Sequence, residues 1–424
     1  MLFKKKNFYD FFIIIFPLGI LLGPAIINIF LVLISVFFLF HLKNNSKKIF
    51  LNHWVISFFF FWFYLILISL FSENFLSSFQ SSVSQIRFFL FVLFFAFFFN
   101  LKKNLHFFIL TIHLILLFVC LDVNLQFLSG YDTFGYPSEG YSDELYPAFA
   151  HWKNNNIHVG RLSGPFGTEL IPGSFIAKLS CPIIFYNISR LKSVSTEKKF
   201  KIILFLLLLF ESVLITGERL SLIIILFSFI TSFFIYCKLK KIIVILSTFS
   251  LISFLLYFNL DKNNFLKKRI SDGIHILQNI EESSYGRIYN STLNMWSDNK
   301  IFGVGLKNYR IKCGKLIDPN PNSLHAYCSP THPHNVFLEF LVETGLVGLF
   351  FFLVFYFFLL KYIVKSFKII NTNPYTGIFY GAVFHILFAI IPFLPSGSFF
   401  STFNASLYWF NIGIALSYII SNKK

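Results

Sequence analysis

A histidine and an asparagine lie where a polar loop meets a long apolar segment, in the stretch THPHNVFLEFLVETGLVGL at residues 331–349. His334 and Asn335 occupy the junction, and Gly345 and Gly348 follow inside the apolar segment. An imidazole with an ordinary pKa of about 6.5 gains or loses its proton close to neutral pH, so it suits a general base. Many interfacial histidines are only hydrated, but an ionisable group at membrane depth is costly and therefore marks a candidate site.

Several arginines lie at or before apolar segments on what we predict to be one side of a membrane. They are Arg87, Arg161, Arg219 and Arg287. A guanidinium keeps its charge and binds diphosphate oxygens through two parallel hydrogen bonds. Each arginine alone fits a lipid headgroup contact, or an ion pair with Glu169 or Glu218, equally well. Together with His334, the arginines favour an anion-binding site.

Two carboxylates follow the junction at helical spacing. Asn335, Glu339 and Glu343 recur at every fourth residue, so on a helix they share one stripe. Such a stripe should face protein or water and not lipid. We favour a structural role for the two carboxylates, pairing with a neighbouring arginine such as Arg219, over orientation of His334 or contact with a substrate.

The composition indicates a membrane protein. The chain has 424 residues, of which 56% are hydrophobic and 13% charged, and its mean hydropathy is +0.70. A soluble domain of this length is far less apolar. The net charge of +17 would suggest nucleic acid as the partner of a soluble protein, but the placement of the charges explains it without nucleic acid.

A membrane span needs about 20 apolar residues, and about twelve segments of the chain approach that length. They cover residues 8–22, 24–42, 53–71, 86–100, 105–123, 170–189, 202–217, 219–236, 242–260, 335–360, 375–394 and 402–420. No alternating ten-residue pattern typical of a membrane β-barrel is present. The predicted fold is therefore all-α and polytopic, with residues 1–424 forming a single integral membrane domain.

The basic residues predict the orientation. With the N-terminus in the cytoplasm, more than half of the 36 lysines and arginines fall in short cytoplasmic loops and tails, as the positive-inside rule requires. These lie around residues 4–6, 43–48, 102–103, 190–201, 238–241, 361–368 and 423–424. Both termini are then cytoplasmic.

Two long loops then face outward, at residues 124–169 and 261–333. The longer loop, between predicted helices 9 and 10, should be helical in part. Its segment around 261–283 carries Phe265, Ile270, Ile274 and Leu277 at the spacing of an amphipathic helix, and a second short helix is predicted over 287–298. Function is expected on these loops, because sites favour loops held by a rigid scaffold.

The cysteines separate into two groups. Cys120, Cys181 and Cys237 lie in or at the ends of apolar segments, as fillers of an apolar core do. Cys313 and Cys328 share the longer outer loop, where an oxidising compartment favours a disulfide between them. Two thiols without CxxC spacing are a weak zinc signal, so we expect no metal site.

These motifs resemble the O-antigen ligase and Wzy-type polymerase family of bacterial membrane glycan transferases. THPHN followed by GLVG is similar to the family's histidine motif, and TGERLSL is similar to its arginine motif, although Glu218 stands where many members have serine. The stretches RLSGPFGTELIPGS, NSTLNMWSDNKIFGVGLKNYR and PFLPSGSFFSTFN are also similar to family segments, so the resemblance covers roughly residues 120–410.

The resemblance implies a GT-C-like fold in the bacterial inner membrane, with a periplasmic active site that needs no metal or other cofactor. It implies inverting glycosyl transfer from a glycan linked to undecaprenyl diphosphate, with lipid A–core as the preferred acceptor. His334 would be the base, Arg161, Arg219 and Arg287 would bind the diphosphate, and Asn335, Glu339 and Arg87 would support them. Gly345 and Gly348 would allow close packing.

Other functions stay open from the sequence. The motifs do not distinguish a ligase from a Wzy-type polymerase or a protein O-oligosaccharyltransferase, because these enzymes share them. A flippase for lipid-linked glycans would also need many spans and outward arginines. A flippase, however, needs polar groups along a central path, whereas here the polar groups gather on the predicted outer side.

Overall fold

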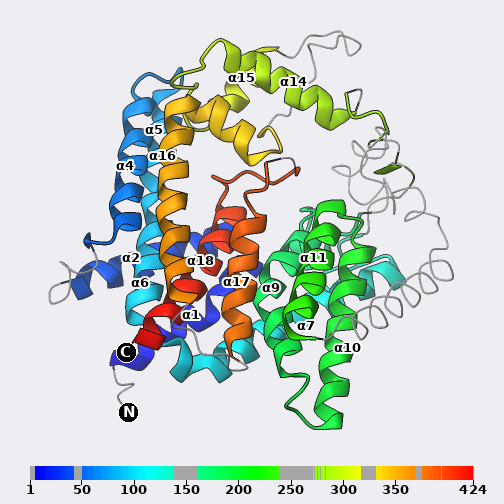
Figure 1. Cartoon of the computed structure of the whole chain (residues 1–424). Helices are drawn as coiled ribbons and strands as arrows, with labels where there is room; N and C mark the ends of the chain where they lie inside the picture. The colour runs from blue at the N-terminus through cyan, green and yellow to red at the C-terminus, as the bar shows by residue number, and fades with distance from the viewer. Residues whose placement is uncertain are drawn as a thin grey trace.

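The computed structural model of the protein describes most of the chain (Figure 1). The described residues are 5–42, 50–137, 161–237, 271, 273–274, 276, 278–281, 283–316, 331–367, 375–392 and 394–423.

The described part is helical and contains no β-strand beyond an isolated bridge between Tyr131 and Pro137. Its helices in chain order are α1 (Lys5–Leu21), α2 (Pro24–His41), α4 (His53–Ser69), α5 (Phe75–Ser84), α6 (Ile86–Phe98), α7 (Leu101–Ser129), the 3-10 turn η2 (Gly164–Phe166), α9 (Pro172–Arg190), α10 (Thr196–Ile215), α11 (Arg219–Tyr236), α14 (Ser284–Ser297), α15 (Tyr309–Leu316), α16 (Val336–Phe367), α17 (Thr376–Phe388) and α18 (Thr402–Lys423).

The predicted apolar segments in the described part coincide with helices, while 242–260 lies outside the described residues. The segments long and apolar enough to cross a membrane are Phe75–Phe98, Leu101–Ser129, Arg219–Tyr236, Val336–Phe367 and Thr402–Asn422. Shorter apolar helices accompany them. The described part is therefore all-helical, with the apolar helices of a multi-pass membrane protein, whereas the total of about twelve spans and the GT-C-like arrangement stay predictions.

Helix α9 is the centre of one half of the molecule, packed between α7, α10, α11 and α17 (Figure 1). It approaches α17 closely because glycines face it. A Cβ on Gly377 would lie 2.5 Å from the Phe185 carbonyl oxygen, and one on Gly381 would collide with the Cys181 carbonyl oxygen. Small residues four apart allow two helix backbones to meet in this way. α9 can therefore be less apolar than a lipid-facing helix, since protein surrounds it.

Helix α16 is broken at Gly345, where φ is 66° and ψ is −173°. The backbone N–H groups of Val304 and Gly305 donate to the carbonyl oxygens of Val342 and Glu343 at 2.9 and 2.8 Å. On the other side of the break, Leu346 N–H donates to the Lys300 carbonyl oxygen at 3.0 Å. The outer-loop segment 300–305 thus supplies the hydrogen-bond partners that the break removes from the helix.

The glycines predicted to allow close packing have different neighbours. Gly345 lies against the backbone of Ile301 and Gly303, in the outer loop. Gly348 lies against α4, where an added Cβ would be 2.8 Å from Cε1 of Tyr64. The Tyr64 hydroxyl donates to the Thr344 carbonyl oxygen at 2.7 Å, one residue before the break. Gly345 therefore allows the outer loop to pack closely against α16, and Gly348 allows α4 to do so.

The two described helices of the longer outer loop, α14 and α15, lie at the end of the molecule opposite both termini (Figure 1). α14 begins close to the predicted helix at 287–298, whereas α15 was not predicted. In the predicted amphipathic helix, the described residues from 271 to 278 are helical and Ile274 is exposed, but Phe265, Ile270 and Leu277 lie outside the described residues. The loop predicted to begin at 124 begins later, since α7 continues to Ser129.

Cys313 joins α15 to its neighbours. It is fully buried with Met295 of α14, Tyr309 of α15 and Val342 of α16, and it is disulfide-bonded. Cys120, Cys181 and Cys237 are free. The predicted partner, Cys328, lies outside the described residues, so that pairing stays a prediction.

We predict that Gly345→Ala destabilises the protein by at least about 1–3 kcal/mol, because the φ and ψ at this position are essentially restricted to glycine. The added Cβ would also collide with the Ile301 carbonyl oxygen. The measurement is the midpoint of thermal unfolding of the purified protein in detergent. Gly314→Ala on α15 is the matched control, since nothing lies within 4 Å of its added Cβ. Equal midpoints for the two variants would show that the break does not need glycine.

Candidate functional site

The backbone of His334 is held in a conformation that few non-glycine residues adopt. Its φ is 52°, in the left-handed region. Its carbonyl oxygen accepts hydrogen bonds from Ser396 N–H at 2.8 Å and from the Tyr289 hydroxyl at 3.4 Å. Backbone strain of this kind persists only where surrounding contacts impose it, and it concentrates at functional sites. The carbonyl contacts tie His334 both to α14 and to the segment that follows α17.

Aromatic rings surround the His334 imidazole. The His332 ring centroid lies 4.1 Å away, and the Tyr285 ring meets the imidazole edge-on at 6.0 Å. Tyr285 and Tyr289 lie one turn apart on α14, so one face of that helix covers the histidine. These contacts remove water from the ring and restrict its position.

Burial lowers the pKa of His334 below its ordinary value, and the positive charge of Arg161 lowers it further. Burial and the neighbouring His334 and Lys307 lower the pKa of His332 to about 3. Both imidazoles are therefore neutral at pH 7. A neutral imidazole accepts a proton, which is what a general base requires.

Asn335 begins α16. Its side-chain oxygen accepts from Leu338 N–H at 3.1 Å, which is the N-cap bond of the helix. Its amide nitrogen donates to the Pro392 carbonyl oxygen at 2.6 Å and to that of Leu394 at 3.4 Å. Asn335 thus fixes the start of α16 to the end of α17, next to the segment that holds His334.

The two carboxylates on the Asn335 stripe anchor backbone segments. Glu339 accepts hydrogen bonds from the Ser398 hydroxyl and, at 2.7 Å, from Phe399 N–H. Glu343 accepts from Lys307 N–H at 3.0 Å. We expected pairing with an arginine such as Arg219. The contacts observed are instead with these hydroxyl and backbone donors, which satisfy a buried carboxylate in place of water.

The short loop that begins at residue 161 positions the Arg161 side chain. Gln126 of α7 accepts from the N–H groups of Ser163 and Gly164 at 3.0 and 2.8 Å, and donates to the Ser163 hydroxyl at 3.0 Å. Arg161 Nη2 donates to the Leu170 carbonyl oxygen at 2.5 Å and lies 3.8 Å from the Glu218 carboxylate. The guanidinium is therefore held in place by both a carbonyl and a charge.

The predicted arginines differ in where they lie relative to His334. Arg161 acts on the His334 charge. Arg287 lies on α14 between the two tyrosines that contact His334, but it leaves the helix on a different side. Arg219 is the first residue of α11, where a Cβ on Gly273 would lie 3.2 Å from its Nε.

Arg87 contacts a different part of the fold. It donates to the Ser84 carbonyl oxygen at 3.0 Å and to the Thr402 hydroxyl at 3.5 Å, and it lies over the Phe88 ring. Arg87 therefore contacts the start of α18.

Several residues of the site were not singled out in the sequence. They are His332, Tyr285, Tyr289, Ser396 and Gln126. His332 stands two residues before His334 and Ser396 lies in the PFLPSGSFFSTFN stretch, so both were within motifs that had been noted. The tyrosines and Gln126 carry no such signal, because their role depends on which helix face meets the histidine or the Arg161 loop.

Within the described residues, no group of three or more His, Cys, Asp or Glu side chains is arranged to hold a metal ion.

Part of the chain matches a known protein family. Residues 204–353 match the family model described as O-antigen ligase (Wzy_C). The match supports the O-antigen ligase and Wzy-type family. It includes Arg219, Arg287 and His334, whereas Arg161 lies before it. No curated protein matches the chain.

We predict that Asn335→Ala destabilises the start of α16 by about 1–2 kcal/mol, because it removes the N-cap acceptor. Asn335→Asp is the matched variant: it keeps the oxygen that caps Leu338 N–H and removes the donor to Pro392. The thermal midpoint in detergent should fall for alanine and recover in part for aspartate. Hydrogen exchange near residues 394–399 should rise in both variants. Unchanged exchange in both would show that Asn335 does not hold this segment.

Proposed function

We propose that the protein is an O-antigen ligase-like glycosyltransferase. It moves a glycan from undecaprenyl diphosphate to lipid A–core, at the periplasmic face of the bacterial inner membrane. The observation that carries this proposal is the neutral, backbone-strained His334 at the start of α16, inside the segment that matches the ligase family.

The reaction forms one glycosidic bond and breaks another. The acceptor hydroxyl oxygen attacks the anomeric carbon while the bond from that carbon to the diphosphate oxygen breaks, so the anomeric configuration is inverted. His334 takes the hydroxyl proton and the electron pair of the broken bond leaves with the diphosphate. The site uses no metal in this scheme. The fixed ring position matters, because a base acts only within hydrogen-bond reach of the proton it removes.

The arginines stabilise the leaving diphosphate. Arg161, Arg219 and Arg287 supply positive charge where negative charge grows as the bond breaks. Arg161 supports this role because its guanidinium is already oriented by the Leu170 carbonyl and the Glu218 carboxylate. A preorganised cation needs little reorganisation when the reaction occurs. Burial lowers the pKa of His334, and the charge of Arg161 lowers it further, so this one arginine would serve both the base and the leaving group.

Other acceptors define the alternatives. A Wzy-type polymerase would transfer to another lipid-linked glycan, and a protein O-oligosaccharyltransferase to a serine or threonine, with the same base and arginines. A lipid-linked glycan flippase would move its substrate without transfer. Transfer by the purified protein, without nucleotide or ion gradient, separates the enzymes from the flippase. The lipopolysaccharide pattern of a deletion strain separates the ligase from the polymerase. Loss of a ligase leaves no polymer on the core, whereas loss of a polymerase leaves a single repeat unit on it.

We predict that His334→Ala abolishes glycan transfer while the protein still inserts and accumulates in the membrane. Removing a general base typically lowers the rate by about 10²–10⁴-fold. The measurement is transfer in vitro from a lipid-linked glycan to lipid A–core, with purified protein in detergent. His106→Ala is the control, because that histidine lies on α7 near its predicted cytoplasmic start, far along the chain from the site. Substantial residual transfer by His334→Ala would contradict the base role.

We predict that transfer depends on pH through His334. The base must be neutral, so activity should rise with pH as His334 loses its proton, and this acid limb should lie below the ordinary histidine pKa near ~6.5. Arg161→Gln removes a nearby positive charge, so the pKa of His334 should rise and the acid limb should move to higher pH. The measurement is transfer rate against pH at saturating donor, with Lys201→Gln as the control. An acid limb that does not move in Arg161→Gln would show that Arg161 does not set the protonation of His334.

A further inference from the structure

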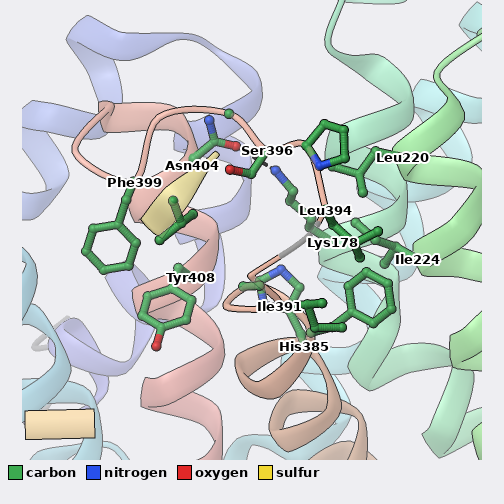
Figure 2. Close-up of a pocket in the computed structure, with 15 residues that line it drawn as sticks. Lys178, Leu220, Ile224, His385, Ile391, Leu394, Ser396, Phe399, Asn404 and Tyr408 are labelled. Atoms are coloured by element: carbon green, nitrogen blue, oxygen red, sulfur yellow. Dashed lines mark hydrogen bonds between the residues drawn. The ribbon is translucent and has the colours of Figure 1, made fainter. Parts of the chain in front are cut away.

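A cavity opens among α9, α11, α17 and α18, beside the segment that holds His334 (Figure 2). Together with the open solvent at its mouth it measures about 580 Å³. Ser396 lines the cavity, and the N–H of the same residue donates to the His334 carbonyl oxygen. The cavity therefore adjoins the candidate active site but is lined by residues to which the reaction above gives no role.

Lys178 of α9 brings a cation to the wall of this cavity. Its Nζ donates to the Asn404 side-chain oxygen at 2.6 Å, and Figure 2 shows the lysine reaching toward Asn404. The Glu218 carboxylate attracts Lys178 and also lies 3.8 Å from Arg161. Two cations thus share one carboxylate. With all three groups charged, a surplus positive charge lies next to the cavity, which favours an anionic ligand.

Polar groups at the wall have unused hydrogen-bonding capacity. Both ring nitrogens of His385, a residue that is 2% exposed, and the Ser396 hydroxyl have no hydrogen-bond partner among the described residues. An ammonium has three N–H donors, and Asn404 accepts one of those of Lys178. An unsatisfied buried polar group costs about 1–3 kcal/mol. A neutral imidazole donates through only one of its ring nitrogens. A ligand group with several acceptor oxygens would accept from that N–H, from the Ser396 hydroxyl and from the Lys178 ammonium together.

The opposite wall of the cavity is apolar and lies between α11 and α17. Leu220 and Ile224 line it from α11, and Phe388 and Ile391 line it from α17 and the turn that follows. Leu220 directly follows Arg219, so this wall begins at a predicted diphosphate-binding residue. One turn further along α11, the Phe227 ring meets Phe388 at 6.0 Å and extends the apolar surface. The apolar wall suits a hydrocarbon chain that enters between the two helices.

We propose that this cavity binds the phosphoryl group and the first isoprenoid units of the lipid-linked donor, with Lys178 holding a phosphate oxygen. The surplus charge matches the phosphoryl group, the free donors match its oxygens, and the apolar wall matches the chain. The inference rests on the proposed function and adds to it a cation outside the predicted arginines. A membrane phospholipid shares this chemistry, a phosphoryl group on an apolar chain, so the test separates the two sources.

The test measures binding to the purified full-length protein in detergent, with farnesyl diphosphate, inorganic pyrophosphate and farnesol as probes. Farnesyl diphosphate should bind more tightly than either of the others, because it occupies both walls. Lys178→Met should weaken it about tenfold or more, as expected for loss of a hydrogen bond to a charged group. Lys201→Met is the matched control, since Lys201 is exposed on α10 and pairs with Glu197. The affinity of this variant for farnesyl diphosphate should equal that of the wild-type protein.

A second variant tests the apolar wall without altering charge and decides the matter if Lys178→Met does not fold. Ala389 lines the cavity, so Ala389→Phe should fill its chain-binding side. Pyrophosphate binding should be unchanged, while the advantage of farnesyl diphosphate over pyrophosphate should disappear. Retention of that advantage would overturn the proposal. So would equal affinity of folded Lys178→Met and wild-type protein for farnesyl diphosphate, or equally effective displacement of the probe by phosphatidylglycerol.

Binding is measured without acceptor, so the two proposals can fail separately. If the protein shows the expected binding pattern but transfers no glycan, the proposed function falls and the cavity assignment to an isoprenoid phosphate stands. If it transfers glycan while Lys178→Met binds farnesyl diphosphate normally, the function stands and this inference falls.

Discussion

The break of α16 at Gly345 removes backbone hydrogen bonds from a helix that is long and apolar enough to cross a membrane. Water is absent from a bilayer core, so the freed groups need partners from the protein itself. The outer-loop segment 300–305 provides them on both sides of the break. As a result the outer loop cannot move independently of α16. The helix that presents His334 and the loop helix α14 that covers it are joined through this backbone pairing.

A second set of contacts closes the site from the opposite side. The segment after α17 donates to the His334 carbonyl through Ser396 and to the Glu339 carboxylate through Ser398 and Phe399. A buried carboxylate without donors is strongly unfavourable, so Glu339 draws this segment to α16. The left-handed backbone of His334 is thus imposed from the loop, from α16 and from the chain after α17. Three elements distant in sequence fix one imidazole.

One carboxylate, that of Glu218, interacts with two cations. Glu218 attracts both Arg161 and Lys178, and it also accepts from Gly173 N–H at 3.1 Å and from the Ser221 hydroxyl at 2.9 Å. Glu218 therefore holds the start of α11 against α9 while leaving a positive surplus on the side of His334. That surplus lowers the pKa of His334 through Arg161 and supplies an attractive field for a phosphoryl group. In the proposed reaction, the protonation of the base and the binding of the diphosphate would both depend on this arrangement of charges.

The sequence by itself determined the helical, multi-pass character of the chain and the junction at His334 and Asn335 where a long apolar helix begins. Apolar length and the cost of ionisable groups near lipid are properties of short segments, so they can be read without a fold. The same reasoning identified Glu339 and Glu343 as one stripe with a structural role. Their hydrogen-bond donors come from residues 398–399 and from Lys307, and the arginine whose charge acts on both is Arg310 and not Arg219. Only the tertiary structure decided that Tyr285, Tyr289 and Ser396 enclose His334, and that Gln126 positions the Arg161 loop. Hydrogen-bond partners and the exclusion of water depend on which faces of distant helices meet, and no local pattern of residues contains that information.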